Sequence, residues 1–205
     1  MRRTPCGGHD RMTPFTQHRG VALPLLRDNI DTDAIIPSRE MRTVSRSGLA
    51  AGLFAPWRYL DPDARTPNPE FALNQPEYSG ASILLAGDNF GCGSSREHAV
   101  WALMESGFRV VIAPSFATIF RNNALRNGLL TVALEQHDLD ELVEWVSADP
   151  VTHAIKLDLE ACMIEFDLER EKKVFSVDPT AREMLLEGLD EIGLTEQSMG
   201  SGDAF

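Results

Sequence analysis

The sequence of 205 residues has no apolar run approaching the ~20 residues needed to cross a bilayer. It also has no excess of positive charge, because 31 acidic residues outnumber 19 basic ones and give a net charge of −12. The second absence argues against nucleic acid or an anionic membrane as the main partner, although a small anionic ligand stays open. The basic opening MRRTPCGGHDR is followed by no apolar core, unlike a secretory signal. We therefore expect a cytoplasmic protein.

Cysteine is scarce as well. Cys6, Cys92 and Cys162 are far apart and form no Cys-x-x-Cys pair, no zinc pattern and no set that would hold an iron–sulfur cluster. The five histidines are scattered along the chain. The sequence therefore predicts that this chain binds no metal and no cofactor of its own.

What is present is ordinary globular composition, with 43% hydrophobic and 24% charged residues. The length suits one domain with a core of its own. We expect a disordered leader over residues 1–11, a single domain over residues 12–195 and a disordered tail over residues 196–205. Residues 39–76 are rich in Pro, Gly and Asn, which favours long loops with little regular structure.

Strand and helix signals alternate through the middle of the chain. GVALPLL (residues 20–26), ASILLA (81–86), RVVIA (109–113) and LLTVAL (129–134) are apolar runs of strand length. Two segments predict helices. SREHAVWALMESG ends at Gly107, a natural C-terminal stop, and PSFATIFRNNALRNG has Ser115 as a candidate N-cap and Gly128 as a candidate end. This βαβαβ order predicts right-handed crossovers and a largely parallel sheet.

The C-terminal part has a different pattern. DLDELVEWVSAD (residues 138–149) predicts a helix, and the short runs AIKLDL, CMIEFDL and KVFSV predict antiparallel strands. A last helix is expected to begin at Asp178-Pro179, an N-cap followed by proline at the first helical position. The predicted fold class is α/β, with a largely parallel core and antiparallel C-terminal strands.

One loop has the composition of an anion site. GDNFGCGSSREHA runs from Gly87 to Ala99, between a predicted buried strand and a helix, so its amides and the helix N-terminus converge. Gly91 and Gly93 would let a ligand approach the backbone, and Arg96 offers a planar fork suited to a carboxylate. The loop has neither the Lys of a P-loop nor the glycine spacing of a dinucleotide site. A plain turn with a serine cap is the alternative.

A second stretch, DNIDTDAIIP (residues 28–37), concentrates three aspartates before an apolar turn. It lacks the glycine and the twelfth-position Glu of an EF-hand. From sequence alone, capping and turn chemistry is the favoured interpretation of this stretch.

Taken together, these segments resemble the small subunits of 3-isopropylmalate dehydratase (isopropylmalate isomerase), within the aconitase superfamily. The segments that carry the resemblance are NIDTDAIIPSRE, NPEFALNQPEYSGASILLAGDNFGCGSSREHAVWAL and GFRVVIAPSFATIFRNNALRNGLL, in that order, and it extends over residues 16–194. The fold implied is an aconitase-like swivelling β/β/α domain.

The resemblance also implies a function. It is the interconversion of 2-isopropylmalate and 3-isopropylmalate by dehydration and rehydration in leucine biosynthesis, a hydro-lyase activity expressed only in complex with a large subunit. That partner would carry a [4Fe-4S] cluster, and this chain would close over it. The other expected ligand is the small dicarboxylate substrate.

The roles implied for individual residues follow the same resemblance. Ser94 matches a serine that acts as the catalytic base, and Asp33 matches an aspartate that orients its neighbours. Ser95 and Arg96 match contacts to a substrate carboxylate, and Arg46 is a candidate for a second one.

Other residues keep two interpretations. Leu49, Leu53 and Phe54 could face the isopropyl group or belong to the core, and an exposed loop position is the alternative for Arg46. His98 is expected to be a packed, hydrogen-bonded structural histidine. Two alternative functions also stay open: a homoaconitase or methylmalate/citraconate-type hydro-lyase subunit, and a carboxylate-binding module without catalysis.

Overall fold

The computed structural model describes residues 12–41, 47–167 and 172–189. The predicted leader, the predicted tail and Arg46 lie outside these residues. None of the helices in the described part is both long and apolar enough to span a membrane.

A four-stranded parallel sheet forms the centre of the fold, as the alternating pattern predicted. Its strands, in spatial order, are β2 (Ala22–Leu25), β5 (Ile83–Ala86), β6 (Val110–Ala113) and β7 (Leu130–Ala133). Successive residues of β5 enter different cores, with Ile83 and Leu85 on one face and Leu84 and Ala86 on the other. The runs are continuously apolar because both faces of the sheet are covered.

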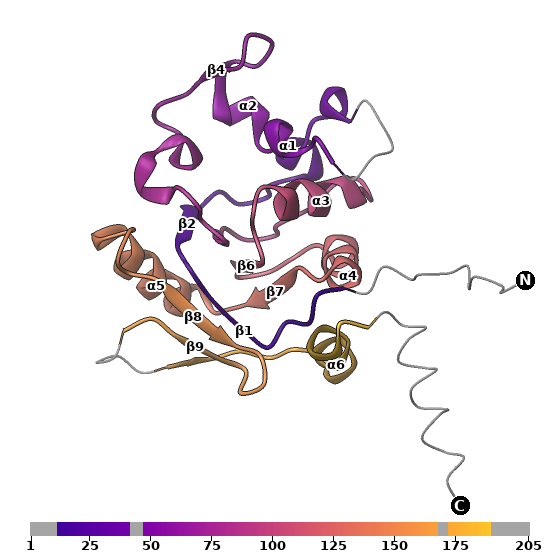
Figure 1. Cartoon of the computed structure of the whole chain (residues 1–205), viewed down its shortest axis with the longest axis vertical. Coiled ribbons are helices and arrows are strands. Elements are labelled where there is room, and N and C mark those ends of the chain that lie inside the picture. The colour runs from indigo at the N-terminus through magenta and orange to yellow at the C-terminus, as the bar shows by residue number, and fades with distance from the viewer. Residues whose placement is uncertain (1–11, 42–46, 168–171, 190–205) are drawn as a thin grey trace, which may run out of the picture.

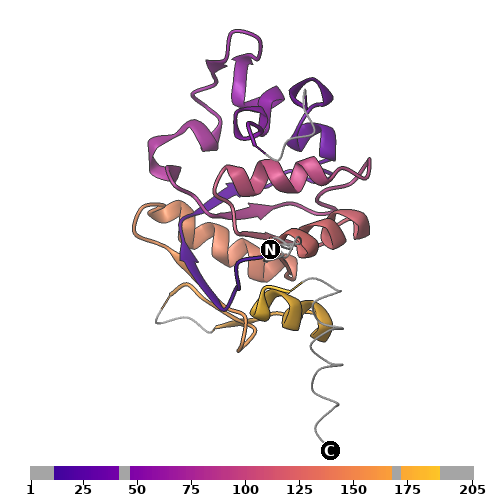
Figure 2. The same cartoon turned by 45° about the vertical axis from the view of Figure 1, so that its right-hand side comes forward.

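Helices cover one face of this sheet. They are α1 (Thr32–Ile35), α2 (Ala55–Arg58), α3 (Glu97–Glu105) and α4 (Thr118–Asn127). Beyond α2 a short hairpin pairs β3 (Tyr59–Asp61) with β4 (Thr66–Pro67). Figures 1 and 2 show α1 and α2 stacked outside α3, at the end of the molecule farthest from α6. Among the described residues of 39–76, short helices and this two-stranded hairpin are the regular structure, which confirms the loop-rich expectation for that part.

The second face is covered by a helix and a second sheet. The elements are α5 (Gln136–Ala148) and an antiparallel sheet ordered β1 (Gln17–Gly20), β8 (Ile155–Asp158), β9 (Met163–Glu165) and β10 (Lys173–Val174). The last helix, α6 (Pro179–Glu187), begins where predicted, because the Asp178 side chain accepts from the amide of Ala181 at 3.0 Å. The layers are thus helices, parallel sheet and antiparallel sheet, which confirms the predicted β/β/α class.

Two details differ from the sequence prediction. The expected single strand at residues 20–26 is two strands, because the chain leaves the antiparallel sheet after Gly20 and enters the parallel sheet at Ala22. A side chain at Gly20 would place its Cβ 1.9 Å from the Ser82 hydroxyl oxygen, so glycine is needed where the sheets cross. Ser115 is not the N-cap of α4; its hydroxyl donates to the Asp88 carboxylate at 2.5 Å.

The two ends of the described chain lie side by side. The amide of Phe15 donates to the carbonyl of Leu185 at 2.8 Å. A Cβ added to Gly188, the left-handed end of α6, would lie 2.3 Å from the carbonyl oxygen of Met12. These contacts join the start of the domain to its last helix.

Candidate functional site

Two loops meet at the carboxyl edge of the parallel sheet. One follows β2 and carries the aspartates, and the other follows the neighbouring strand β5 and carries the glycines. Backbone bonds join them: Asn29 N–H to Asp88 C=O at 2.8 Å, Gly91 N–H to Ile30 C=O at 2.8 Å, and Thr32 N–H to Cys92 C=O at 2.9 Å. Ligands in α/β folds commonly bind outside this edge of the sheet.

The three aspartates have separate roles. Asp28 accepts from the amide of Asp88 at 2.8 Å, and Asp31 caps α1 by accepting from the amide of Ala34 at 2.7 Å. The capping and turn interpretation therefore holds for these two. Asp33 instead forms an ion pair with Arg96 and accepts from the Ser38 hydroxyl at 3.3 Å. All three aspartates are exposed, and Asp33, with a side chain that is 53% exposed, is the one that pairs with the arginine.

The first half of the glycine loop is structural. Phe90 is buried, and Gly91 has φ +76° in a position where a Cβ would lie 2.3 Å from the Phe120 ring. Gly91 therefore makes room for a core aromatic residue, and the expectation that it admits a ligand is wrong. Gly93 has φ +91°, and a Cβ there would be 3.4 Å from that of Asp31, an ordinary contact. Its requirement is the left-handed backbone.

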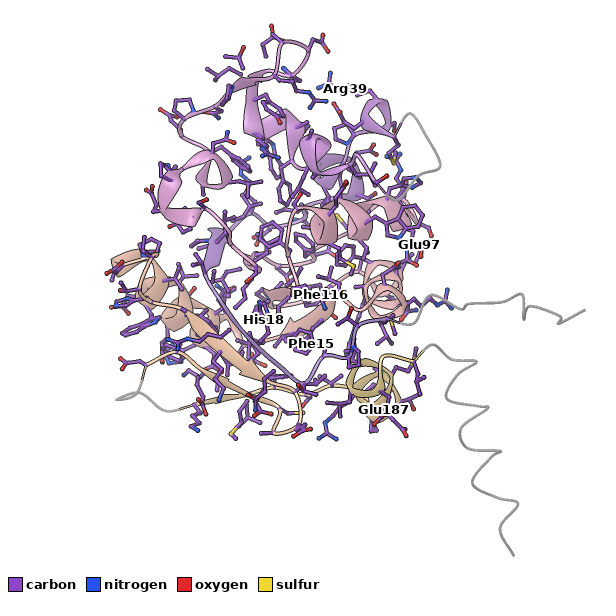
Figure 3. All side chains as sticks on the ribbon, viewed as in Figure 1. Phe15, His18, Arg39, Glu97, Phe116 and Glu187 are labelled. Atoms are coloured by element: carbon purple, nitrogen blue, oxygen red, sulfur yellow. The ribbon has the colours of Figure 1, made fainter. Side chains whose placement is uncertain are left out.

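The second half of the loop is exposed. Ser94 and Ser95 are both exposed, and the carbonyl of Ser94 accepts from the Thr32 hydroxyl at 3.1 Å. Within the described chain, the amides of Ser94, Ser95 and Arg96 donate no hydrogen bond. Figure 3 shows Glu97 at the end of α3 where this loop enters the helix. Free amides at this point are suited to an oxyanion or a carboxylate.

Arg96 is the N-cap residue of α3 and has a side chain that is 22% exposed. Its guanidinium has five N–H donors, so pairing with Asp33 leaves donors for a second carboxylate. The structure thus brings Ser94, Ser95, Arg96 and Asp33 to one edge, as predicted for a common site. Neither of two cavities in the described part of the chain, of about 320 Å³ and 580 Å³, includes any of these four residues.

Glu97 has a different set of partners from Arg96. Its carboxylate accepts from the side-chain amide of Asn127 at 2.9 Å, and the same Asn127 accepts from the Trp101 indole at 2.9 Å. This contact links the first turn of α3 to the last residue of α4. His98 packs its ring 4.8 Å from that of Trp101, and the expected hydrogen bond on His98 is not found among the described residues.

The apolar candidates belong to the core. Leu49 is 2% exposed, and Leu53 and Phe54 are 0% exposed. They pack with α1 and α3 under the site, so the core interpretation holds over direct contact with an isopropyl group.

No three His, Cys, Asp or Glu residues among those described are grouped so as to hold a metal ion. Cys92 and Cys162 are free thiols, and the Cys92 Sγ lies 3.4 Å from the carbonyl of Asn29.

Sequence reasoning missed Glu105, the last residue of α3. Its carboxylate accepts from the amides of Gly48, Leu49 and Ala50, in a segment more than fifty residues earlier. A lone glutamate at a helix end gives no signal of such a long-range contact.

The three layers and the polar edge define a class, the aconitase-like swivelling domain. The family described as "Aconitase C-terminal domain" matches residues 12–137. The crystal structure of 3-isopropylmalate dehydratase from Methanocaldococcus jannaschii superposes with a TM-score of 0.64 at 28% identity, covering 92% of this chain and 99% of that chain.

Two sequence relatives narrow the class. A 3-isopropylmalate dehydratase small subunit from Cupriavidus necator is 58% identical over 194 residues, which cover 95% of this chain and 93% of that protein. The small subunit from Methylibium petroleiphilum is 50% identical over 191 residues, covering 90% and 88%. The chain belongs to the 3-isopropylmalate dehydratase small-subunit family.

Proposed function

We propose that this chain is the small subunit of a 3-isopropylmalate dehydratase, a hydro-lyase of leucine biosynthesis that interconverts 2-isopropylmalate and 3-isopropylmalate. The observation that carries the proposal is the exposed Ser94 next to Arg96 and Asp33, on an edge with free amides. Relatives named for this activity share 58% and 50% of their residues with the chain. The single domain over residues 12–195 is part of the same proposal.

The roles that we propose for the residues are those implied by the resemblance, and their surroundings support them. Ser94 is the proposed base, which takes a proton from the carbon next to a substrate carboxylate and returns it on rehydration. A serine oxygen is a weak base unless its charge is stabilised, and the free loop amides and Arg96 can supply that stabilisation. Ser95 and Arg96 bind the substrate carboxylate, while Asp33 holds the Arg96 guanidinium in place. Arg46, outside the described residues, is proposed as the second carboxylate contact.

Ser94 and Ser95 are exposed at this edge, and a large subunit is the proposed partner that covers them. The described residues do not fit an iron–sulfur cluster, because they contain no grouped ligand set. We place the [4Fe-4S] cluster on that partner, where its open iron would act as a Lewis acid toward the substrate. A cytoplasmic location, with neither nucleic acid nor membrane as a partner, completes the proposal.

Reconstitution tests the proposal. The chain is co-expressed with the large subunit encoded in the same genome, and the complex is assayed for hydration and dehydration of 2-isopropylmalate, homoaconitate and methyl-substituted malates. We expect turnover of isopropylmalate, with the large subunit alone as the inactive control. Preference for homoaconitate or a methylmalate would reassign the substrate. If the complexes bind dicarboxylate but turn over none of these substrates, the chain is a carboxylate-binding module without catalysis.

A further inference from the structure

The Glu105 carboxylate accepts hydrogen bonds from backbone amides in a distant segment. Its two oxygens accept from three consecutive backbone amides, with N···O distances of 2.6 Å from Gly48, 2.5 Å from Leu49 and 2.9 Å from Ala50. These amides begin the 3₁₀ turn Ala50–Gly52, so the carboxylate binds the start of a turn as an anion would. The last residue of α3 thereby binds the backbone of residues 48–50.

Partial desolvation alone would raise the pKa of Glu105, but the three amide hydrogen bonds outweigh it and lower the pKa below its ordinary value. The carboxylate is therefore ionised at neutral pH. Hydrogen bonds to a charged acceptor are roughly twice as strong as neutral ones.

The held segment leads directly to the site. Past the turn, the amide of Phe54 donates to the carbonyl of Ile35, the last residue of α1, at 2.8 Å. The same short helix carries Asp33, which pairs with Arg96 at the start of α3. Contacts therefore run in a closed ring from one end of α3 through the turn and α1 to its other end, about 13 Å away along the helix axis.

We propose that Glu105 is a positioning residue for the carboxylate-binding arginine. The carboxylate fixes the turn against α3, and the turn then fixes the position of α1. This position keeps Asp33 paired with Arg96 and so sets the orientation of the guanidinium. The ring contains Arg96 but neither Ser94 nor the loop amides, so we expect Glu105 to affect substrate binding more than proton transfer. The proposal rests on the proposed function only in that Arg96 is taken to bind substrate.

The turn held by Glu105 also has core contacts, because Leu49, Leu53 and Phe54 are buried beneath it. We expect these contacts to keep the segment folded in a Glu105 variant. What a variant loses is the bond between the turn and the helix. We therefore expect a shift in position and not an unfolded segment.

Glu105→Gln tests the proposal in the reconstituted complex. The amide side chain keeps one acceptor but faces the amides with an N–H₂ group, so the contact is weakened without loss of volume. We expect KM for isopropylmalate to rise about tenfold, the equivalent of one charge-assisted hydrogen bond, while kcat stays within about twofold. An unchanged KM overturns the proposal.

A double-variant cycle separates positioning from a general structural effect. In an Asp33→Ala background the ring is already broken, so Glu105→Gln should raise KM no further. If the two effects multiply as independent ones, Glu105 does not act through Asp33 and the proposal fails.

Asp149→Asn is the matched control. Asp149 accepts from the amide and hydroxyl of Thr152 at 3.3 and 2.6 Å, at the end of α5 on the other side of the sheet. It is expected to leave KM unchanged. If it raises KM as much as Glu105→Gln does, the effect is not specific to the ring.

A readout in the free chain is independent of activity. Glu105→Gln should speed hydrogen exchange at the amides of residues 48–50 and shift the ¹⁵N signals of the Arg96 guanidinium. If these changes occur while the complex lacks dehydratase activity, the proposed function fails and the ring stands. If the Arg96 signals do not move, the ring fails whatever the activity.

Discussion

The two sides of the parallel sheet differ in how their charged and polar groups are paired. On the antiparallel side, charges are paired within the chain: Lys173 lies 2.7 Å from Asp138 and 3.0 Å from Glu141, and Lys156 lies 3.4 Å from Glu165. On the helical side, the loop edge leaves the Ser94 and Ser95 amides without acceptors among the described residues. Both sides have a buried core, but the loop edge of the helical side also has exposed polar groups available for binding.

The largest expected effect tests the exposed edge. Ser94→Ala in the reconstituted complex should lower kcat by about 10²–10⁴-fold, because a proton-transferring group contributes that much. Ser94 is exposed, so the free energy of unfolding should stay within about 0.5 kcal/mol of wild type. Single-turnover kinetics and urea unfolding measure the two quantities. A near-normal kcat would remove Ser94 as the base.

The opposite result is expected on the other face. Leu157 is fully buried in β8, which lies between β1 and β9. Leu157→Ala should lower the free energy of unfolding by about 2–5 kcal/mol through the cavity it creates. KM of the complex should stay unchanged at temperatures where the variant is folded. A KM rise comparable to that of a site variant would show that the antiparallel sheet shapes the site, and the contrast between the faces would disappear.

The smallest effect lies at the junction of the two sheets, where Figure 3 shows Phe15 and His18 close together. His18 Nε2 lies 2.8 Å from the Ser82 hydroxyl, and burial, with a smaller contribution from Arg109, lowers the pKa of His18 below 6.5. The folded state thus favours neutral His18, so its contribution is complete above pH 6.5 and is lost as the pH falls below that value.

His18→Gln removes this titration. The unfolding free energy of the variant should fall less steeply between about pH 6.5 and 5, by less than about 1 kcal/mol because the ring is only half-buried. Urea unfolding at several pH values checks the difference. Parallel pH curves for the two proteins would contradict the assignment.

Much of the fold was readable from sequence. Continuous apolar runs such as residues 81–86 predict strands covered on both faces, and Asp178 followed by proline predicts the start of α6. Local chemistry decides these features. Ser115 is not a cap because its hydroxyl donates to Asp88, a long-range partner. A side chain at Gly20 would collide with Ser82, which precedes β5 and is also distant in the sequence.

The site was predictable to a similar degree. Ser94 and Arg96 follow one strand and Asp33 follows its neighbour, so motif and topology together place them at one edge. The division of the aspartates was not readable, because it depends on which amides each carboxylate meets after folding. Nor was Glu105, whose partners are more than fifty residues away.

The bond from Phe15 to Leu185 bears on how the protein can be rebuilt. Because the two ends of the described domain lie side by side, a short linker could join them. New termini could then be placed elsewhere, for example in the β3–β4 hairpin. Such a circularly permuted chain should keep the loop edge intact.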